Sequence, residues 1–222
     1  MPIEKNMIDL HTHSILSDGA LLPSELVRRA YCRGYKAIAI SDHVDESNID
    51  FVVPRLVKAC TRLSSFWKIK VIPAIEITHS PLECFSGMIK YARSHEIKLV
   101  LVHGETIVEP VIAGTNKKAL NEDIDILAHP GLITLEEARL AAKRNIFLEL
   151  TKRAGHSLSN GHVASVAREA GAKLVLNSDT HRPEDLLDEE SSRKIILSAG
   201  LSNTELEVVL RNSQFLVKKV LT

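Results

Sequence analysis

The feature that most constrains the fold is an alternation of short apolar, β-branched runs with helical segments along the 222-residue chain. We expect seven strands, at Met7–Leu10, Lys36–Ile40, Lys70–Ile75, Lys98–Val102, Asp125–Ala128, Ile146–Leu150 and Lys173–Asn177. Continuous apolar strands with helices between them indicate a parallel sheet that is covered on both faces. A weak repeat, Gly34–His43 against Gly171–His181, is typical of a closed or nearly closed βα barrel. No linker or composition shift marks a boundary, so we predict one domain over residues 1–222.

Helices are expected between and after these strands, and each is bounded by capping or breaking residues. They are Pro23–Cys32, Pro54–Trp67, Pro81–Ser94, Glu109–Asn121 with a break at Gly114, Thr134–Arg144, Asn160–Ala170, Arg193–Ala199 and Thr204–Val209, followed by a short apolar end. Thr134 and Glu137 have the spacing of a capping box. Pro73 lies inside the third strand, where its missing N–H predicts a bend or a bulge.

Composition narrows the range of functions. The 28 basic and 28 acidic residues cancel, which argues against a general nucleic-acid binder or a membrane-surface protein. Cys32, Cys60 and Cys84 are odd in number and form no CxxC pair, so we expect buried thiols in a reducing compartment. No apolar run approaches the ~18 residues of a membrane span, and no signal-peptide core is present. We therefore expect a cytoplasmic protein.

Polar residues of metal-ligand type follow nearly every predicted strand. In chain order these are His11 and His13, Asp42 and His43, Glu76, His103, His129, and then Asp179 and His181. The sixth strand is instead followed by the basic pair Lys152 and Arg153. The carboxyl ends of barrel strands open on one face, where the catalytic residues of such barrels lie. Asp18 follows the first pair of histidines on a loop that Gly19 allows to turn tightly. Together the strand ends predict a metal site.

A single histidine after a strand is more often a packing or surface residue, and His79, His95, His156 and His162 belong to that class. His156 is a partial exception, because it lies in the loop after the sixth strand. Imidazoles and carboxylates without thiolates suit Zn, Mn or Fe. The predicted donors are too many for one tetrahedral ion, so we expect two or three divalent ions.

The ordered motifs HxH…D, SDH, E, H, AHPG and SDTH resemble the PHP (polymerase and histidinol phosphatase) superfamily, over Asp9 to about His181. The resemblance implies a distorted TIM-like (β/α)7 barrel with a trinuclear metal site, and many such proteins are phosphoesterases. It implies one ion held by His11, His13, Glu76 and Asp179, a second held by Glu76, His103 and His129, and a third held by Asp18, His43 and His181. Asp18 stands where some members have histidine. We expect Asp42 to orient His43.

The resemblance further implies hydrolysis of a small phosphate monoester, such as histidinol phosphate, by a metal-activated hydroxide. Glu76, Asp179 and His181 are the expected catalytic residues, and the third ion, or a protonated His or Asp beside it, would assist the leaving oxygen. Lys152, Arg153 and Arg182 are candidates for phosphate binding, with Arg better suited to a bidentate contact.

Two alternatives differ in class. A PHP-type nuclease or exonuclease would more naturally show a basic stripe with aromatic residues, whereas aromatics are 4% of this chain. A non-catalytic scaffold, such as a ribonucleoprotein subunit, typically loses the ligands, whereas each position that we can place is filled. The sequence therefore favours an enzyme with a small phosphorylated substrate, and it argues against nucleic acid or a membrane as partner.

Overall fold

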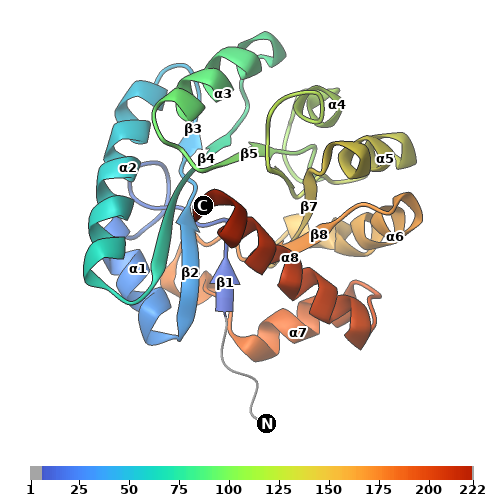
Figure 1. Cartoon of the computed structure of the whole chain (residues 1–222). Coiled ribbons are helices and arrows are strands. Elements are labelled where there is room, and N and C mark those ends of the chain that lie inside the picture. The colour runs from blue at the N-terminus through green and yellow to red at the C-terminus, as the bar shows by residue number, and fades with distance from the viewer. Residues whose placement is uncertain (1–6, 222) are drawn as a thin grey trace.

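The computed structural model describes residues 7–221, in which a parallel sheet rolls into a nearly closed barrel with helices outside it (Figure 1). The strands are β1 (Met7–Asp9), β2 (Tyr35–Ile40), β3 (His43–Val44), β4 (Lys70–Ile77), β5 (Leu99–His103), β6 (Ile126–Ala128), β7 (Phe147–Thr151) and β8 (Leu174–Asn177). The helices are α1 (Pro23–Cys32), α2 (Ile49–Phe66), α3 (Phe85–Ser94), α4 (Thr115–Ala119), α5 (Leu135–Arg144), α6 (Asn160–Ala170), α7 (Glu189–Ser198) and α8 (Asn203–Leu221). Short 3₁₀ turns are η1 (Leu82–Cys84), η2 (His156–Ser159) and η3 (Pro183–Asp185).

The strand order is β1-β2-β4-β5-β6-β7-β8, with the short β3 beside β4 beyond the end of β2. All of these pairs are parallel. The barrel is joined between β1 and β8 by a bridge from Thr12 to Thr180, where the His13 amide donates to the Thr180 carbonyl at 2.8 Å. The predicted distorted α/β barrel is confirmed, and the seven predicted strands lie within two residues of observed ones.

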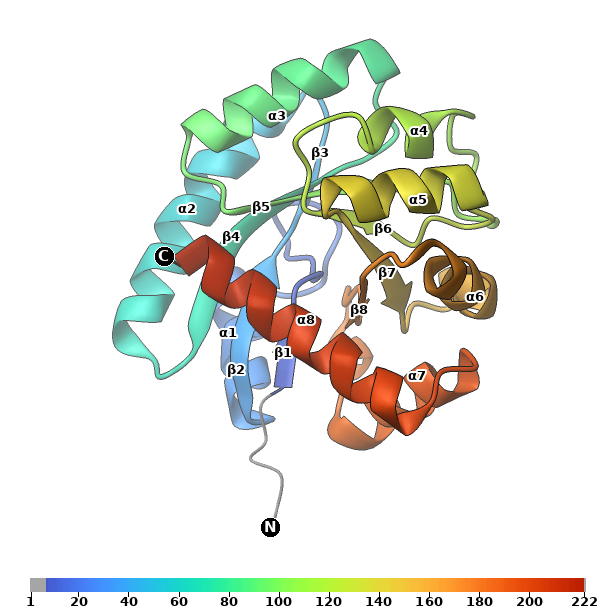
Figure 2. The ribbon, with the colours of Figure 1, turned by 45° about the vertical axis from the view of Figure 1, so that its right-hand side comes forward.

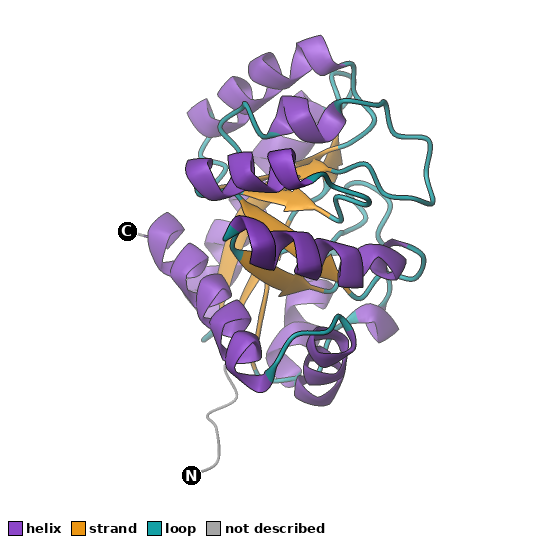
Figure 3. Cartoon of the chain, turned by 90° about the vertical axis from the view of Figure 1, so that its right-hand side faces the viewer, coloured by secondary structure: helices purple, strands orange, loops and turns teal. Residues whose placement is uncertain are grey.

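Apolar side chains fill the barrel and also separate it from the helices. The interior cluster consists of Leu10, Ala39, Ile72, Ala74, Leu99, Leu101, Ile126, Phe147, Val175 and Leu216. Leu216 comes from α8, which packs on β8 and β1 and lies across one end of the barrel (Figure 2). The longer loops gather at the opposite end (Figure 3). The barrel is therefore closed by apolar packing at one end, and loops surround the other.

Two differences from the sequence expectations concern proline. Helix α2 begins at Ile49, five residues before Pro54. Ile49 and Val53 are buried there, so packing of the first turns outweighs the local cost of proline inside a helix. The register of β4 runs without interruption through Pro73, which pairs with Ile40 at the end of β2. The expected bulge is therefore wrong. Pro73 lacks an N–H, but it lies where the pairing between β2 and β4 ends, so the pairing before it is not disrupted.

Other differences concern helix length and the cysteines. The segment 109–114, expected to be helical, is a loop, and only Thr115–Ala119 is helical after Gly114 (φ 92°). The C-terminal end is one continuous helix over Asn203–Leu221, because its apolar face continues past Val209 to the buried Leu216. All three cysteines are free, but Cys32 is exposed and Cys84 is only partly buried. Among residues 7–221, no helix has both the length and the apolar character that a membrane span requires.

Candidate metal centre

Side chains alternate between the two faces of a strand. This two-residue period places polar side chains inside the barrel at the carboxyl ends of the strands. In β4, Ala74 belongs to the interior apolar cluster, and Glu76 follows at the same two-residue spacing. In β5, Leu101 and His103 repeat this relation. Because alternate residues of a strand face the same side, Glu76 and His103 extend the inward-facing rows. Glu76 is completely buried and His103 is 3% exposed.

A tight turn after β1 carries the first donors. The amide of Gly19 donates to the Ser14 carbonyl at 3.0 Å. A Cβ at position 19 would lie 2.3 Å from the His13 carbonyl oxygen, so only glycine fits there. The turn therefore folds back on itself and brings Asp18 towards the strand ends.

Asp42 stabilises this turn and does not orient His43. Its carboxylate accepts hydrogen bonds from the Ser14 amide, the Ser14 hydroxyl and the Ser17 hydroxyl, each at 2.7 Å. His43 Nδ1 instead lies 2.7 Å from the Thr78 hydroxyl. The expected pairing of Asp42 with His43 is wrong, because the backbone after β2 directs the two side chains to different neighbours.

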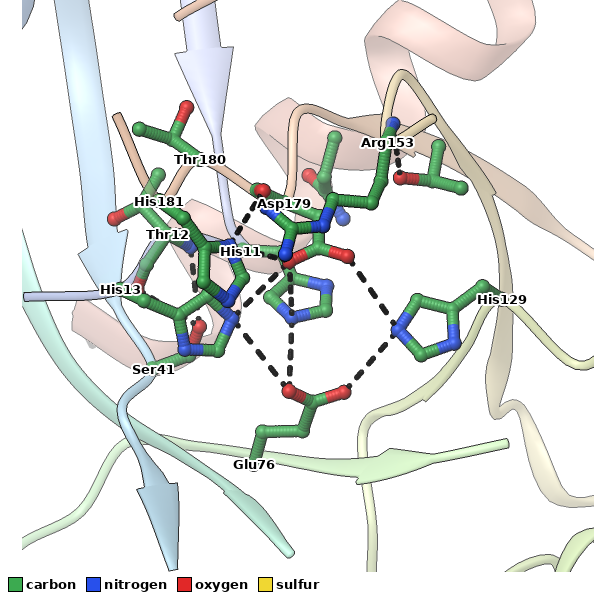
Figure 4. Close-up of polar contacts among 12 residues, drawn as sticks. His11, Thr12, His13, Ser41, Glu76, His129, Arg153, Asp179, Thr180 and His181 are labelled. Carbon is green, nitrogen blue, oxygen red and sulfur yellow. Dashed lines mark hydrogen bonds and ion pairs between the residues drawn. The ribbon is translucent and has the colours of Figure 1, made fainter. Parts of the chain in front are cut away.

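Two carboxylates and three histidines form the centre of the cluster (Figure 4). Glu76 Oε2 lies 3.1 Å from His11 Nε2 and 3.5 Å from His13 Nε2. Asp179 Oδ1 lies 3.3 Å from His13 Nε2. His129 Nε2 faces both acids, at 3.4 Å from Glu76 Oε1 and 3.6 Å from Asp179 Oδ2. Residues from β4 and from the segments after β1, β6 and β8 thus converge on one point.

The donors expected for a third ion also lie together. Asp18 Oδ2 is 3.2 Å from His181 Nε2, and Asp18 Oδ1 is 3.6 Å from His43 Nε2. Asp18 has a side chain that is 55% exposed, so this group forms the open edge of the cluster. His43 also reaches the centre, with Nδ1 2.9 Å from Glu76 Oε2.

On the other side of the centre, the structure places His156, His79 and Glu109 beside the predicted donors His103 and His129. His103, His129 and His156 have donor atoms within 4.8 Å of one another. Glu109 lies against this group, with Oε2 3.1 Å from His103 Nε2 and Oε1 3.0 Å from His156 Nε2. The exception made for His156 is confirmed, and His79, expected to be a surface or packing residue, also lines the pocket. No sequence pattern singled out Glu109, because it lies in a segment that was expected to be helical.

Glu149 is a further residue that was missed. It extends into the barrel from β7 and is completely buried. Its Oε1 lies 2.8 Å from His11 Nδ1 and accepts from Asn177 Nδ2 at 2.7 Å, while Oε2 accepts from the His129 amide at 3.1 Å. These contacts hold His11 with its other nitrogen towards the centre. The available signal was a carboxylate inside an apolar strand, which rarely occurs without a partner.

The protonation pattern of the histidines tests whether the cluster fits metal ions. His11, His103 and His181 each place Nδ1 2.8–3.1 Å from an oxygen that accepts, namely the Glu149 carboxylate or the carbonyl of Gly104 or Asp179. A neutral ring that donates from Nδ1 has a lone pair on Nε2. Each Nε2 faces a carboxylate oxygen at 3.1–3.2 Å. Two acceptor atoms at this distance repel each other. A cation bound between Nε2 and the carboxylate oxygen makes the contact favourable, as in sites where histidine binds a metal.

Unsatisfied polar atoms support the same conclusion. Both carboxylate oxygens of Glu76, both ring nitrogens of His13 and Asp179 Oδ1 are buried without a hydrogen bond. Such groups cost about 1–3 kcal/mol each unless something satisfies them. His129 (φ 25°) and Asp179 (φ 55°) also adopt left-handed backbone conformations that are uncommon outside glycine. The donor set, its burial and its strain together suit divalent metal ions.

The local electrostatics favour anionic carboxylates at the centre and neutral rings at His13 and His156. Burial alone would raise the pKa of Glu76, but the charges of His11 and His43 hold this pKa well below its usual range. The pKa of Asp179 is likewise well below normal, because the charges of nearby histidines, that of His11 above all, outweigh burial. Burial lowers the pKa of His13 to about 3 and that of His156 to about 4. Anionic Glu76 and Asp179 therefore lie beside neutral His13 and His156. The neighbouring carboxylates outweigh burial and raise the pKa of His11, His43 and His103.

The cluster lies in a small pocket of about 200 Å³. Of the three basic residues considered for phosphate, Arg153 lines this pocket, and in Figure 4 its side chain extends over the centre. Lys152 Nζ instead donates to the carbonyls of Glu184 and Asp185, at 2.9 and 2.8 Å. Arg182 is exposed and is absent from the pocket lining. The geometry thus favours Arg153 among the three.

The comparisons with known proteins agree with this geometry. The PHP domain family model matches residues 9–127, which is more than half of the chain. This chain belongs to the PHP domain family. Membership confirms the resemblance seen in the motifs.

Relatives of the family cover nearly the whole chain. Uncharacterized protein MJ1295 of Methanocaldococcus jannaschii is 46% identical over 215 residues, which cover 96% of this chain and 99% of that protein. A probable phosphatase of Shewanella pealeana is 28% identical over 230 residues, covering 88% and 85%. The names of such relatives support a metal-dependent phosphoesterase of the PHP type.

Two solved structures show the same fold. Histidinol phosphate phosphatase from Lactococcus lactis, solved with zinc, L-histidinol and phosphate, has a TM-score of 0.61 at 18% identity, covering 90% of this chain and 95% of that one. A chain in archaeal ribonuclease P with mature tRNA has a TM-score of 0.73 at 16% identity, covering 96% and 90%. At these identities the likeness establishes the shared barrel only.

Proposed function

We propose that this protein is a phosphatase that hydrolyses a small phosphate monoester, histidinol phosphate or a related compound, with two or three divalent ions (Zn, Mn or Fe). The observation that carries the proposal is the convergence of imidazole Nε2 atoms on buried carboxylates that lack hydrogen bonds. Ions bound there would supply positive charge for the phosphoryl oxygens and a water with a pKa near neutrality.

The three groups of donors divide among the ions as follows. His11, His13, Glu76 and Asp179 would hold one ion, Glu76, His103 and His129 a second, and Asp18, His43 and His181 a third. The contacts support Glu76 as the residue between the first two groups, since Oε2 faces His11 and Oε1 faces His129. Asp18 likewise faces both of its partners, one with each oxygen.

Other side chains bind and position the substrate in this proposal. Arg153 would bind the phosphate, because it lines the pocket and a guanidinium can contact two phosphoryl oxygens at once. The third ion would assist the leaving oxygen, and His181 would be one of its donors, because Nε2 faces the exposed edge beside Asp18. Glu149 would orient His11 through Nδ1. The small volume of the pocket favours a small substrate over a nucleic-acid chain.

A scaffold role similar to that of a ribonucleoprotein subunit is less well supported. A protein that does not bind metals has no need for nine donor residues around one pocket, several of them buried without hydrogen bonds. For the cellular setting we propose the cytoplasm, which the composition favours.

The test is metal analysis of the purified protein, followed by phosphate release from a panel of small phosphate esters. We expect at least two transition-metal ions per chain, and loss of turnover in His129→Ala. The control variant is His95→Ala, because His95 is exposed at the end of α3 and lies outside the pocket. Fewer than two ions per chain, or full activity in His129→Ala, would contradict the proposal. Salt-dependent DNA binding without ester turnover would favour the nuclease alternative instead.

A further inference from the structure

The loop between β5 and α4, residues 104–114, carries Glu109 into the mouth of the pocket. Besides His103 and His156, the carboxylate contacts His79, whose Nε2 lies 3.2 Å from Glu109 Oε2. Three histidines from three different segments therefore face one side chain. Unlike Glu76 and Asp179, which are 0% and 3% exposed, the Glu109 side chain is 37% exposed.

The base of this loop is held firmly. Glu105 Oε1 accepts from the amides of Gly114 and Asn116 at 3.0 and 2.9 Å, and Asn116 Oδ1 accepts from the Glu105 amide at 3.0 Å. A Cβ on Gly131 would lie 1.8 Å from the Glu105 carbonyl oxygen, so the neighbouring loop also packs closely against the base. Glu109 is thus placed by a rigid base, whereas the tip residue Val108 is 47% exposed.

The contact between Glu109 and His103 suits a cation shared by the two side chains. His103 Nδ1 lies 3.1 Å from the Gly104 carbonyl, which can only accept, so Nδ1 carries the proton of the neutral ring. The lone pair of Nε2 then faces Glu109 Oε2 at 3.1 Å. Ligand atoms of a tetrahedral ion with bonds of 2.0–2.1 Å lie about 3.3 Å apart, so this distance suits two donors of one ion.

We propose that Glu109 is a displaceable fourth donor of the ion that Glu76, His103 and His129 would hold, and that it occupies the place of the incoming phosphate. This inference rests on the proposed metal-dependent function. His156 orients the carboxylate through Oε1. Without Glu109 the second ion has three protein donors, which leaves the open position that a catalytic ion needs. With it, the position is filled by an anion of this chain, on a side chain exposed enough to move away.

The proposal predicts two opposite effects from one substitution, Glu109→Gln. Loss of the charged donor should weaken binding of one Mn²⁺ by about 10–100-fold. Loss of the competing anion should strengthen binding of inorganic phosphate to the Mn²⁺-saturated protein, by about tenfold if Glu109 blocks the position nine-tenths of the time. Isothermal titration of the metal-free full chain with Mn²⁺, and of the loaded chain with phosphate, measures both effects.

The matched control is Glu105→Gln, which weakens the base of the same loop but leaves the Glu109 carboxylate in the chain. If both variants weaken phosphate binding, Glu109 has only a structural role and the proposal is wrong. Unchanged Mn²⁺ affinity in Glu109→Gln would also overturn it. Failure of the wild-type protein to bind Mn²⁺ at all would instead refute the proposed function, so the two failures are distinguishable.

Discussion

The two ends of the barrel are built from the same strands by opposite chemistry. At the end near α8, inward positions hold Ile72, Leu99 and Leu216, which pack with one another. Four residues further along β4 and β5, the same inward rows hold Glu76 and His103. Both ends are almost completely excluded from solvent.

The comparison teaches which end supplies stability and which holds function. Burying apolar side chains stabilises the fold by roughly 25 cal/mol per Å². Burying carboxylates and imidazoles without hydrogen bonds costs free energy until a cation binds. The apolar end therefore stabilises a protein whose other end is unfavourable in the absence of metal.

The largest expected effect comes from Asp179→Asn at the metal end. Asparagine keeps the shape and tolerates the left-handed backbone of Asp179, but it removes the charge from the centre. We expect phosphate release to fall about a thousandfold, while the metal-free protein unfolds at the same or a higher temperature. Kinetics and thermal unfolding measure the two effects. A large loss of stability would show that this end also supports the fold.

Leu216→Ala tests the opposite end. Leu216 is completely buried where α8 closes the barrel, so we expect a loss of about 2–5 kcal/mol in the free energy of unfolding. Metal content per chain should not change, because the cavity is far along the barrel from the donors. Urea denaturation and metal analysis provide the two measurements. Loss of metal at unchanged stability would reverse the assignment of roles to the two ends.

The substitution Arg153→Gln tests whether Arg153 binds the phosphate group at the metal end of the barrel. Hydrogen bonds to charged groups contribute about 1.5–3 kcal/mol, so we expect inorganic phosphate to bind roughly 10–100-fold more weakly. Arg182→Gln is the matched control, because Arg182 is exposed and lies outside the pocket. Equal effects of the two substitutions in a phosphate titration would argue against a specific role for Arg153.

Asp9→Asn gives the smallest expected effect, at the border between the two ends. Burial raises the pKa of Asp9 from 3.8 to about 6, so the folded protein binds more protons than the unfolded chain between these values. Protonation of Asp9 therefore stabilises the folded protein relative to the unfolded chain. This stabilisation is present at low pH and is lost as pH rises through about 6. The metal-free wild type should therefore lose about 1 kcal/mol between pH 5 and pH 7 relative to Asp9→Asn. Parallel pH dependence of the two unfolding curves would contradict this assignment.

Much of the site could be predicted because donors at strand ends are a consequence of strand period and parallel topology. Once Glu76 follows a buried strand, a parallel barrel must direct it towards the same face as His103 and His129. Glu149 was not predicted as a site residue, because it lies inside an apolar strand and the local sequence does not indicate which residue its carboxylate contacts. Its contact with His11 joins residues 138 positions apart.

The elements with wrong boundaries show the limits of local signals. Pro54 predicted a helix start, but burial of Ile49 and Val53 extended α2 before it. Residues 109–114 were expected to be helical, but contacts of the loop 104–114 with Gly131 and the pocket histidines decide its path. Local propensity is worth tenths of a kcal/mol per residue, and packing readily exceeds it.

The sequence by itself determined the barrel, the order of its strands and the donors that follow them, because strand period and connection length are local properties. Tertiary structure alone decided that α8 closes one end, that Asp42 supports a turn, and that Glu109 faces the metal ligands. These outcomes depend on contacts between residues distant in the chain, where burial and charge are set by neighbours that the local sequence does not name.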